Sequence, residues 1–152
     1  MGGIGVKECK SLGLEEARII VEAAIEKAQN TGDRPISIAV VDRHGDPVCL
    51  MRMDGIGGTT AHMALAKCYT AIGTLRDTIE MREIILKRKA TASDFPIPNF
   101  TTIPGGVLLR TKDGMIVGAI GISGRKPTGP GSDEELARAG AAAFEKTEGF
   151  ES

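Results

Sequence analysis

The stretch PISIAVVDRHGDPVCLMRM, residues 35–53, carries the strongest fold signal in this chain. Its first half is a run of β-branched and small apolar residues, and residues 43–46 are typical of a tight turn. Residues 47–53 then predict a return strand. An Asp-Gly pair at residues 113–114 predicts a second hairpin within residues 107–123. The strands of each hairpin are therefore expected to pair antiparallel.

Helices are expected on either side of these hairpins. Apolar residues recur at helical spacing in four stretches, which are residues 14–29, 59–75, 77–88 and 132–146. Phe100 to Ile103 is predicted to be extended and to supply a fifth strand. The sequence therefore predicts an α+β fold, in which helices pack on a five-stranded antiparallel sheet. We expect a flexible N-terminal segment over residues 1–12 and a single domain over residues 13–152.

The composition limits the class of protein. The chain has 152 residues, 41% of them hydrophobic, and a formal net charge of −1. With 3% aromatic residues it offers neither the basic surface nor the stacking platform that nucleic acids need. No apolar run would cross a bilayer, and no signal-like segment opens the sequence. Three cysteines without a C-x-x-C pair argue against a zinc site or a disulfide scaffold and favour a cytoplasmic location.

Lys67 is the first candidate for a functional residue. Between Gly55 and Leu75 it is the only formally charged residue, although 26% of the whole chain is charged. The helix predicted there is small or apolar nearly all round, which is typical of a helix buried on more than one side. A lysine on such a helix must pair with a carboxylate, extend to solvent or line a cavity. Since desolvation would lower its pKa, Lys67 is also a candidate base or Schiff-base amine.

A second candidate site lies just before this helix. Arg52 ends the return strand, Asp54 follows it, and Gly55 opens a glycine-rich turn that leads to Thr59 at the helix start. Unpaired amides at a helix start, together with an arginine, favour a carboxylate or phosphate group. Alternatively, Arg52 and Asp54 pair with each other and the glycines only make a turn.

Further glycine-rich turns lie in the second half of the chain. Gly105 and Gly106 precede one strand, and Ser123 and Arg125 lie at the end of another. Residues 121–125 do not fit the nucleophile elbow G-x-S-x-G, because the last position is Arg. The glycines therefore indicate turns and close packing, while Arg125 is a candidate for contact with an anionic ligand or a second subunit.

The two histidines differ in their expected surroundings. His44 lies in the first hairpin turn and is expected to be exposed. His62 lies in the first turn of the uncharged helix and faces a different side from Lys67. It is a candidate metal ligand, acid or base, or alternatively an interface residue. In an enzyme, His62 or Asp54 would handle the second proton beside Lys67.

Several short motifs, each weak alone, together resemble the GlcG/HbpS-like family, which includes heme-binding proteins. Within residues 12–146 they are IAVVD at 38–42, RMDG at 52–55, GGV at 105–107 and GAIGISG at 118–124. The resemblance implies a profilin-like fold, assembly into homo-oligomers and a tetrapyrrole such as heme as the ligand. Heme-binding relatives are associated with a histidine near the first helix. Because the first histidine here is His44, His62 would have to replace it in a different geometry.

Three readings of the function follow. In the first, the protein is a homo-oligomeric small-molecule-binding protein whose ligand is heme or another small anion. Its ligand-binding residues would be Arg52, Asp54, Gly55, Thr59, Lys67, Gly105, Gly106, Ser123 and Arg125. In the second, it is a catabolic enzyme, an isomerase, lyase or hydrolase that acts on an organic acid through Lys67 and Arg52. In the third, it is an accessory protein in which Lys67 closes a salt bridge between subunits.

Overall fold

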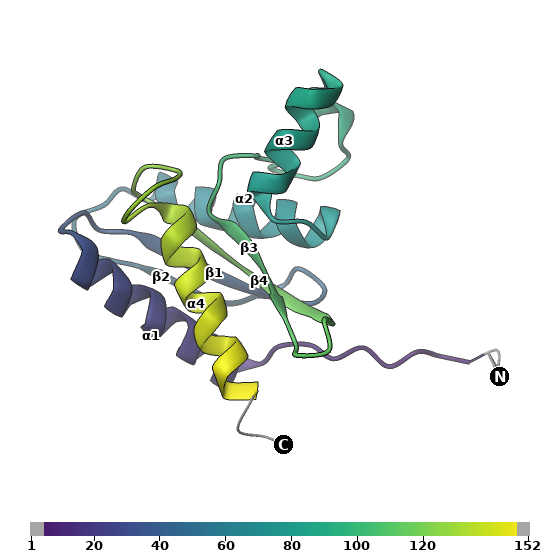
Figure 1. Ribbon diagram of the computed structural model, residues 1–152, viewed down its shortest axis with the longest axis horizontal. Coiled ribbons are helices and arrows are strands. Elements are labelled where there is room, and N and C mark those ends of the chain that lie inside the picture. Colours follow the sequence, from purple (N-terminus) through teal and green to yellow (C-terminus); the bar gives the residue numbers. More distant parts are fainter. Residues whose placement is uncertain (1–4, 149–152) are drawn as a thin grey trace.

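A computed structural model describes residues 5–148 as helices packed on an antiparallel sheet (Figure 1). The strands are β1 (Ser37–Asp42), β2 (Pro47–Arg52), β3 (Gly106–Arg110) and β4 (Ile116–Ser123), in the order β2-β1-β4-β3. The helices are α1 (Leu14–Thr31), α2 (Thr59–Thr74), α3 (Thr78–Arg88) and α4 (Asp133–Glu148), with a 3-10 turn η1 (Ala92–Asp94) after α3. The predicted α+β class is confirmed.

Both predicted hairpins are present. In the first, the Asp42 carboxylate accepts hydrogen bonds from the amides of His44 and Asp46, at 2.9 and 3.0 Å, and so holds the turn. In the second, Gly114 takes a positive φ of 87°, which explains why glycine follows Asp113 there. β1 lies between β2 and β4 and pairs antiparallel with each, so it is one of the two central strands, with β4 the other.

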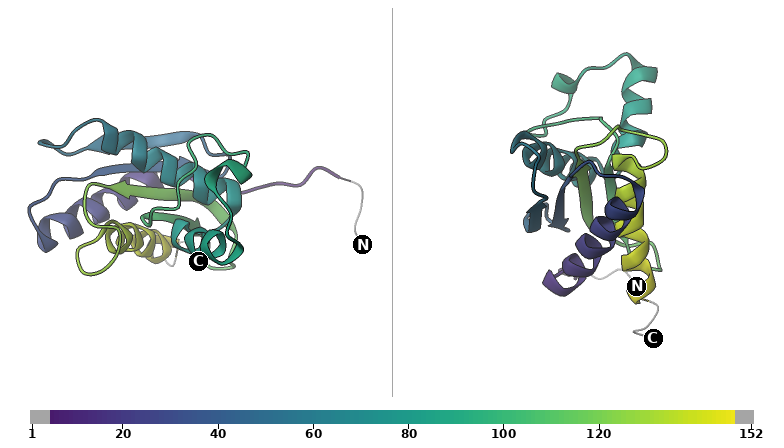
Figure 2. Two further views of the ribbon diagram at one scale, coloured as in Figure 1. Left: turned by 90° about the horizontal axis from the view of Figure 1, so that it is seen from above. Right: turned by 90° about the vertical axis from the view of Figure 1, so that its left-hand side faces the viewer.

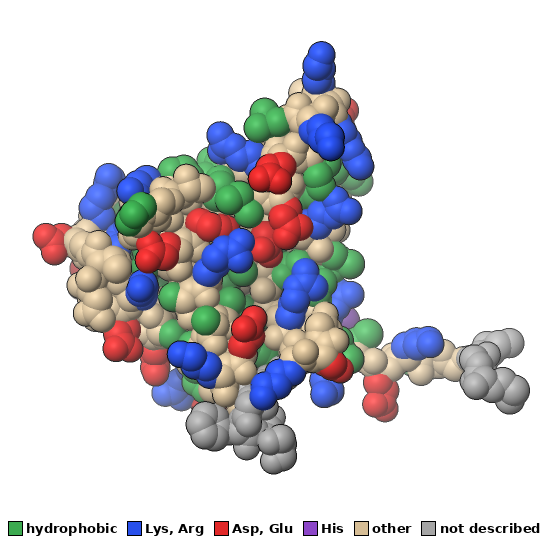
Figure 3. Space-filling model, in the orientation of Figure 1, with side chains coloured by type: hydrophobic (Ala, Val, Ile, Leu, Met, Phe, Trp, Pro, Cys, Tyr) green, Lys and Arg blue, Asp and Glu red, His purple; other side chains and the backbone are tan. Residues whose placement is uncertain are grey.

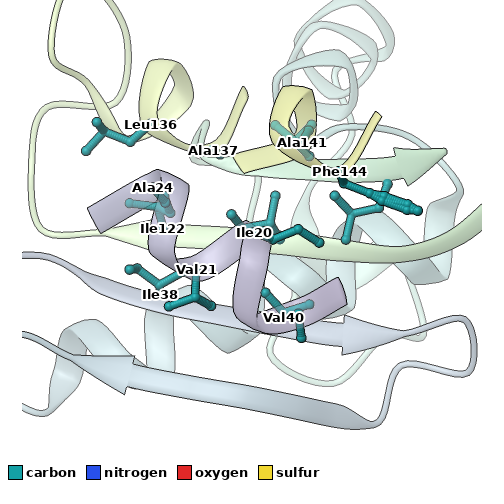
Figure 4. Close-up of a cluster of buried hydrophobic side chains, with 14 of the residues drawn as sticks. Ile20, Val21, Ala24, Ile38, Val40, Ile122, Leu136, Ala137, Ala141 and Phe144 are labelled. Carbon is teal, nitrogen blue, oxygen red and sulfur yellow. The ribbon is translucent and has the colours of Figure 1, made fainter. Parts of the chain in front are cut away.

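The two faces of the sheet are covered differently (Figure 2). Helices α1 and α4 lie side by side on one face, whereas α2 lies on the other. Figure 4 shows the larger core, between the sheet and the α1–α4 pair, where isoleucine, valine and leucine side chains interlock. The smaller core under α2 is made mostly of alanine, with Cys68, Val41 and Leu108. Small residues on that side let α2 approach the sheet closely.

Gly121 of β4 shows how close this approach is. A Cβ atom at Gly121 would lie 2.1 Å from the carbonyl oxygen of Ala64, in α2. Any side chain there would therefore push α2 away from the sheet. Of the glycines at 118, 121 and 124, Gly121 therefore serves helix packing, whereas Gly118 and Gly124 lie close to the backbone oxygens of Val41 and Pro35.

The fifth strand predicted at residues 100–103 is absent from the described chain, so the prediction of a five-stranded sheet was wrong. These residues lie along α2 instead, where the Thr101 amide donates a hydrogen bond to the Thr70 hydroxyl, at 2.9 Å. The sequence pattern of these residues favours an extended backbone. The Thr101 amide, however, donates to a side chain of α2 instead of to a neighbouring strand.

The edge of β3, which a further strand could have extended, is occupied by the start of α3. The Asp77 carboxylate accepts the amide of Leu108 at 2.9 Å, and the Thr78 hydroxyl accepts the amide of Gly106 at 3.0 Å. Two outward-facing amides of the edge strand are thus satisfied by side chains. This arrangement is the physical reason that the sheet stops at β3.

The N-terminal segment joins the fold at Leu12, whose side chain is buried in the larger core and whose amide donates to the carbonyl oxygen of Val117 at 3.0 Å. Residues 1–4, part of the segment predicted to be flexible, and residues 149–152 lie outside the described residues. Residues 5–13 form neither helix nor strand. No helix in the described part of the chain is long and apolar enough to cross a membrane. The profilin-like topology, the single domain and the cytoplasmic location stay predictions.

Candidate functional site

Lys67 lies at the junction of α2, β4 and α4, and only 1% of it is exposed. Its ammonium donates to the carbonyl oxygen of Ile122 at 2.6 Å and to the carboxylate of Asp133 at 3.2 Å. The other oxygen of Asp133 accepts the amide of Arg125 at 2.9 Å. The pairing with a carboxylate that the sequence allowed for Lys67 therefore occurs, and the pair is buried.

The electrostatics of this pair follow from its burial. Desolvation lowers the pKa of Lys67, and the attraction of Asp133 opposes that shift. Desolvation likewise raises the pKa of Asp133, opposed by the charge of Lys67. With the Ile122 carbonyl and the Arg125 amide adding hydrogen bonds to the charged forms, the geometry favours an ion pair.

Gly105 and Gly106 fit tightly against Lys67. A Cβ atom at Gly105 would lie 2.9 Å from the Lys67 ammonium and 2.7 Å from the carbonyl oxygen of Ile122. At Gly106 it would lie 2.6 Å from the backbone carbonyl oxygen of Lys67. Both glycines therefore make room for the buried lysine and its helix. They pack against the ion pair from the side of β3 and leave its ammonium shielded from solvent.

Glu134 is a buried carboxylate next to this ion pair, and the sequence did not single it out. Its side chain is 9% exposed, and neither carboxylate oxygen has a hydrogen-bond partner. The Arg138 guanidinium lies 3.7 Å away, within ion-pair range, and contacts Asp77 as well, at 3.4 Å. Burial raises the pKa of Glu134 to about 7. In the sequence Glu134 is one of three acidic residues at a helix start, which normally indicates a solvated position.

Arg52, Asp54 and Gly55 lie on the exposed surface near the start of α2. The Arg52 guanidinium donates to the carbonyl oxygen of Ile56 at 2.5 Å. Among the ion pairs of the described residues, none joins Arg52 to Asp54, so the alternative in which they only pair with each other is not what the structure contains. Thr59, also exposed, begins α2.

The structure does not bring Arg52 and Lys67 together. Arg52 is opposite Ser37 in the sheet register, and Ser37 is opposite Ser123 of β4. Two strand spacings, roughly 10 Å, therefore separate Arg52 from Ser123. The Lys67 ammonium lies against the Ile122 carbonyl of β4 and is buried, whereas Arg52 is exposed.

Arg125 caps α1 rather than facing open solvent. Its guanidinium donates to the carbonyl oxygens of Ala28 and Gly32, at 2.7 and 3.0 Å, and to the Thr31 hydroxyl at 3.0 Å. The last carbonyls of a helix lack partners within the helix, and a cation is favourable there. Its contacts within the subunit thus give this predicted ligand-binding residue a structural role.

An open groove of about 620 Å³ runs along the outer face of α2, and we call it the α2 groove. It is lined by Thr59, His62, Met63, Leu65, Ala66, Tyr69, Asn99, Phe100 and Thr101. His62 is exposed, on the side of α2 away from the buried Lys67, as predicted. Within the described residues, no hydrogen bond or ion pair engages the His62 ring or the Tyr69 hydroxyl. Among the described residues, no three His, Cys, Asp or Glu side chains lie close enough together to hold a metal ion.

Comparisons with known proteins agree with one another. The chain matches the family model described as "Haem degrading protein HbpS-like" over residues 12–142. Protein GlcG of Escherichia coli K12 is 33% identical over 112 residues, which are 74% of this chain and 81% of GlcG. The crystal structure of a double mutant of Streptomyces reticuli HbpS is 34% identical and has a TM-score of 0.76, covering 93% of this chain and 92% of that one. The crystal structure of the PduOC:heme complex is 26% identical with a TM-score of 0.74, covering 88% and 94%.

Proposed function

This chain belongs to the HbpS-like family, and from that membership and the α2 groove we propose that it binds heme or a related anionic tetrapyrrole. The observation that carries the proposal is the set of side chains that the groove presents. His62, Met63 and Tyr69 all line it, and histidine, methionine and tyrosine are the side chains, with cysteine, that hold heme iron in proteins. The relative PduOC was crystallised as a heme complex, which supports the same ligand class here.

The size and polarity of the α2 groove suit this ligand. Its volume of about 620 Å³ lies within the range of roughly 300–1,000 Å³ that small-molecule and cofactor sites occupy. Leu65, Ala66 and Phe100 supply apolar walls for the macrocycle. Because the His62 ring has no partner elsewhere in the described chain, it is free to bind iron without first losing a contact.

The anionic edge of the tetrapyrrole would lie toward the start of α2. The Ser37 and Thr60 hydroxyls are 2.8 Å apart, which places Arg52, opposite Ser37 in the sheet, next to the first turn of the helix. A guanidinium and the amino-terminal end of a helix both favour carboxylates such as propionates. The predicted residues Arg52, Gly55 and Thr59 thus keep a proposed role, whereas the contacts of Lys67 assign it to the core.

A heme titration of the purified chain tests the proposal. The wild type is expected to show a saturable Soret shift at about one heme per chain, and His62→Ala to lose that shift. His44→Ala is the matched control, because His44 is exposed in a hairpin turn that does not line the groove. If His44→Ala and His62→Ala behave alike, or if no saturable shift occurs, the proposal fails.

We propose further that the subunits associate into a homo-oligomer. The edge strand β2 exposes Leu50 and Met51, each by nearly half of its surface, and pairs on only one side within the described chain. An exposed edge with apolar side chains favours pairing with a second chain. Light scattering should give a mass above the 16.0 kDa of one chain, and Leu50→Lys should lower it.

The enzymatic alternative rests on a different observation. The pKa of Lys67 is lowered by burial, as a base or Schiff-base amine would need. Its ammonium is held by Asp133 and by the Ile122 carbonyl, so catalysis on an organic acid would require this region to open. Borohydride trapping of a carbonyl substrate on Lys67 would support the alternative, and its failure with keto acids would count against it.

A further inference from the structure

A second groove lies at the opposite end of α2, under the part of the chain that projects from the body. In Figure 1, α3 and the loop after it stand away from the sheet and its covering helices. Between α3, this loop and the end of α2 is a groove of about 370 Å³, which we call the α3 groove. It is lined by Gly73, Thr74, Arg76, Met81, Ile84, Arg88, Phe95, Pro96 and Ile97.

One wall of the α3 groove is a single face of α3. Met81, Ile84 and Arg88 are spaced by three and four residues, so they lie on the same side of the helix. The side chains between them lie on other faces of the helix, so this wall of the groove consists of two apolar side chains followed by the Arg88 guanidinium. The helix therefore offers both apolar contact and a positive charge along one line.

The opposite wall is held in place by the loop. The Phe95 ring stacks on the Phe100 ring, with centroids 4.9 Å apart and an interplanar angle of 1°. Ile97 packs on Gly73 of α2, where a Cβ atom would lie 2.9 Å from the isoleucine side chain. Just before Phe95, a capping box between Thr91 and Asp94 fixes the 3-10 turn. The apolar wall is thus formed before any ligand arrives.

Two arginines mark the ends of the α3 groove. Arg76 lies just before α3 and Arg88 is its last residue, so nearly the whole helix, 11 residues and about 16 Å long, lies between them. Both are exposed, and within the described residues neither guanidinium takes part in a hydrogen bond or an ion pair. No carboxylate is among the residues that line the groove. Figure 3 shows both basic and acidic side chains on this projecting part, but the only charged residues that line the groove itself are the two arginines, which favour an anion.

We propose that the α3 groove binds an elongated organic anion, a carboxylate carried on an apolar chain, as in a medium-chain fatty acid. The apolar chain would lie against Met81, Ile84 and Phe95, and the carboxylate would meet Arg76 or Arg88 at one end. A bidentate contact with a guanidinium gives such a carboxylate a defined orientation. This site is separate from the α2 groove and requires no metal ligand.

Decanoate is the probe that tests the proposal, by calorimetric titration and by the backbone amide NMR signals of Gly73 and Thr74. The wild type should bind it saturably, more tightly than hexanoate, and shift these two signals. Arg76→Gln or Arg88→Gln alone should weaken binding by no more than about twofold, because the carboxylate can still meet the other guanidinium. The double variant should weaken it by about fivefold, the scale of one exposed ion pair. Arg82→Gln is the matched control, because Arg82 is an exposed arginine of α3 that does not line the groove.

Three results would overturn the proposal. The first is equal weakening by Arg82→Gln, which would mean a diffuse charge effect. The second is a concentration-dependent shift of the Gly73 and Thr74 signals without decanoate, which would mean that a second copy of the chain fills the groove. The third is competition between heme and decanoate for a site lost in the double variant. Heme binding that depends on His62 but not on Arg76 and Arg88 would leave the two sites distinct, so each can fail alone.

Discussion

Among single residues, Glu134 makes the sharpest prediction about stability. Its pKa is raised from 4.5 to about 7 by burial, so the folded chain binds more protons than the unfolded chain between these pH values. The stabilising effect of the protonated form is therefore present below pH 4.5 and is lost as the pH rises to about 7. The difference amounts to about 3 kcal/mol at most.

Glu134→Gln should remove this pH dependence. Glutamine has the same shape and carries no charge, so the variant should equal the wild type near pH 4 and exceed its unfolding free energy at pH 8 by up to about 3 kcal/mol. Urea denaturation at the two pH values measures the difference. Glu83→Gln is the control, because Glu83 is exposed on α3. A variant that is less stable than the wild type at pH 8 would show that the Glu134 charge is favourable in the fold.

At the scale of elements, the Lys67–Asp133 pair is the contact that joins α2, β4 and the start of α4. Lys67→Met keeps the length and the apolar contacts but leaves Asp133 buried without its cation. Removing one partner of a buried pair costs about 3–5 kcal/mol. We expect Lys67→Met to lose this much, and Lys67→Met with Asp133→Asn to recover part of it, in urea denaturation.

The exposed pair between Lys27 and Glu135 provides the comparison for this prediction. Its atoms are 3.7 Å apart and its side chains are 44% and 37% exposed, so Lys27→Met should cost no more than about 1 kcal/mol. Equal losses for Lys27→Met and Lys67→Met, or no recovery in the double variant, would mean that the buried pair does not couple the three elements.

At the scale of the whole molecule, the sequence predicts the local structure well but predicts the contacts between distant elements poorly. Hairpin turns and amphipathic helices depend on neighbours a few residues apart, and they were predicted. The end of the sheet at β3 depends on Asp77 and Thr78, some 30 residues before the amides they satisfy, and the fifth strand was therefore wrong. The burial of Lys67 could be predicted from its uncharged helix, but its partner Asp133 lies 66 residues later.

The same difference between local patterns and distant contacts explains which candidate site residues were interpreted correctly. Arg125 was a plausible ligand residue because no local pattern reveals that it caps α1, over 90 residues earlier in the chain. Glu134 was missed because acidic residues at a helix start are usually solvated. His62 was placed correctly, since the helical period alone puts it on a different face from Lys67. Faces of one element can thus be predicted from the sequence, whereas partners between elements cannot.

The stability of the whole molecule should be uneven, with α3 and residues 89–105 at the weak end. In α3 only Thr78 and Met81 are buried, and neither core cluster contains a residue of that helix. Segments with few buried apolar contacts open locally at low free energy. Hydrogen exchange followed by mass spectrometry should therefore show the amides of α3 exchanging at least about tenfold faster than those of β1 and β4. Decanoate should slow exchange in α3 of the wild type but not of the Arg76→Gln, Arg88→Gln variant. Uniform exchange across α3 and the sheet would mean that the projecting part unfolds only with the core.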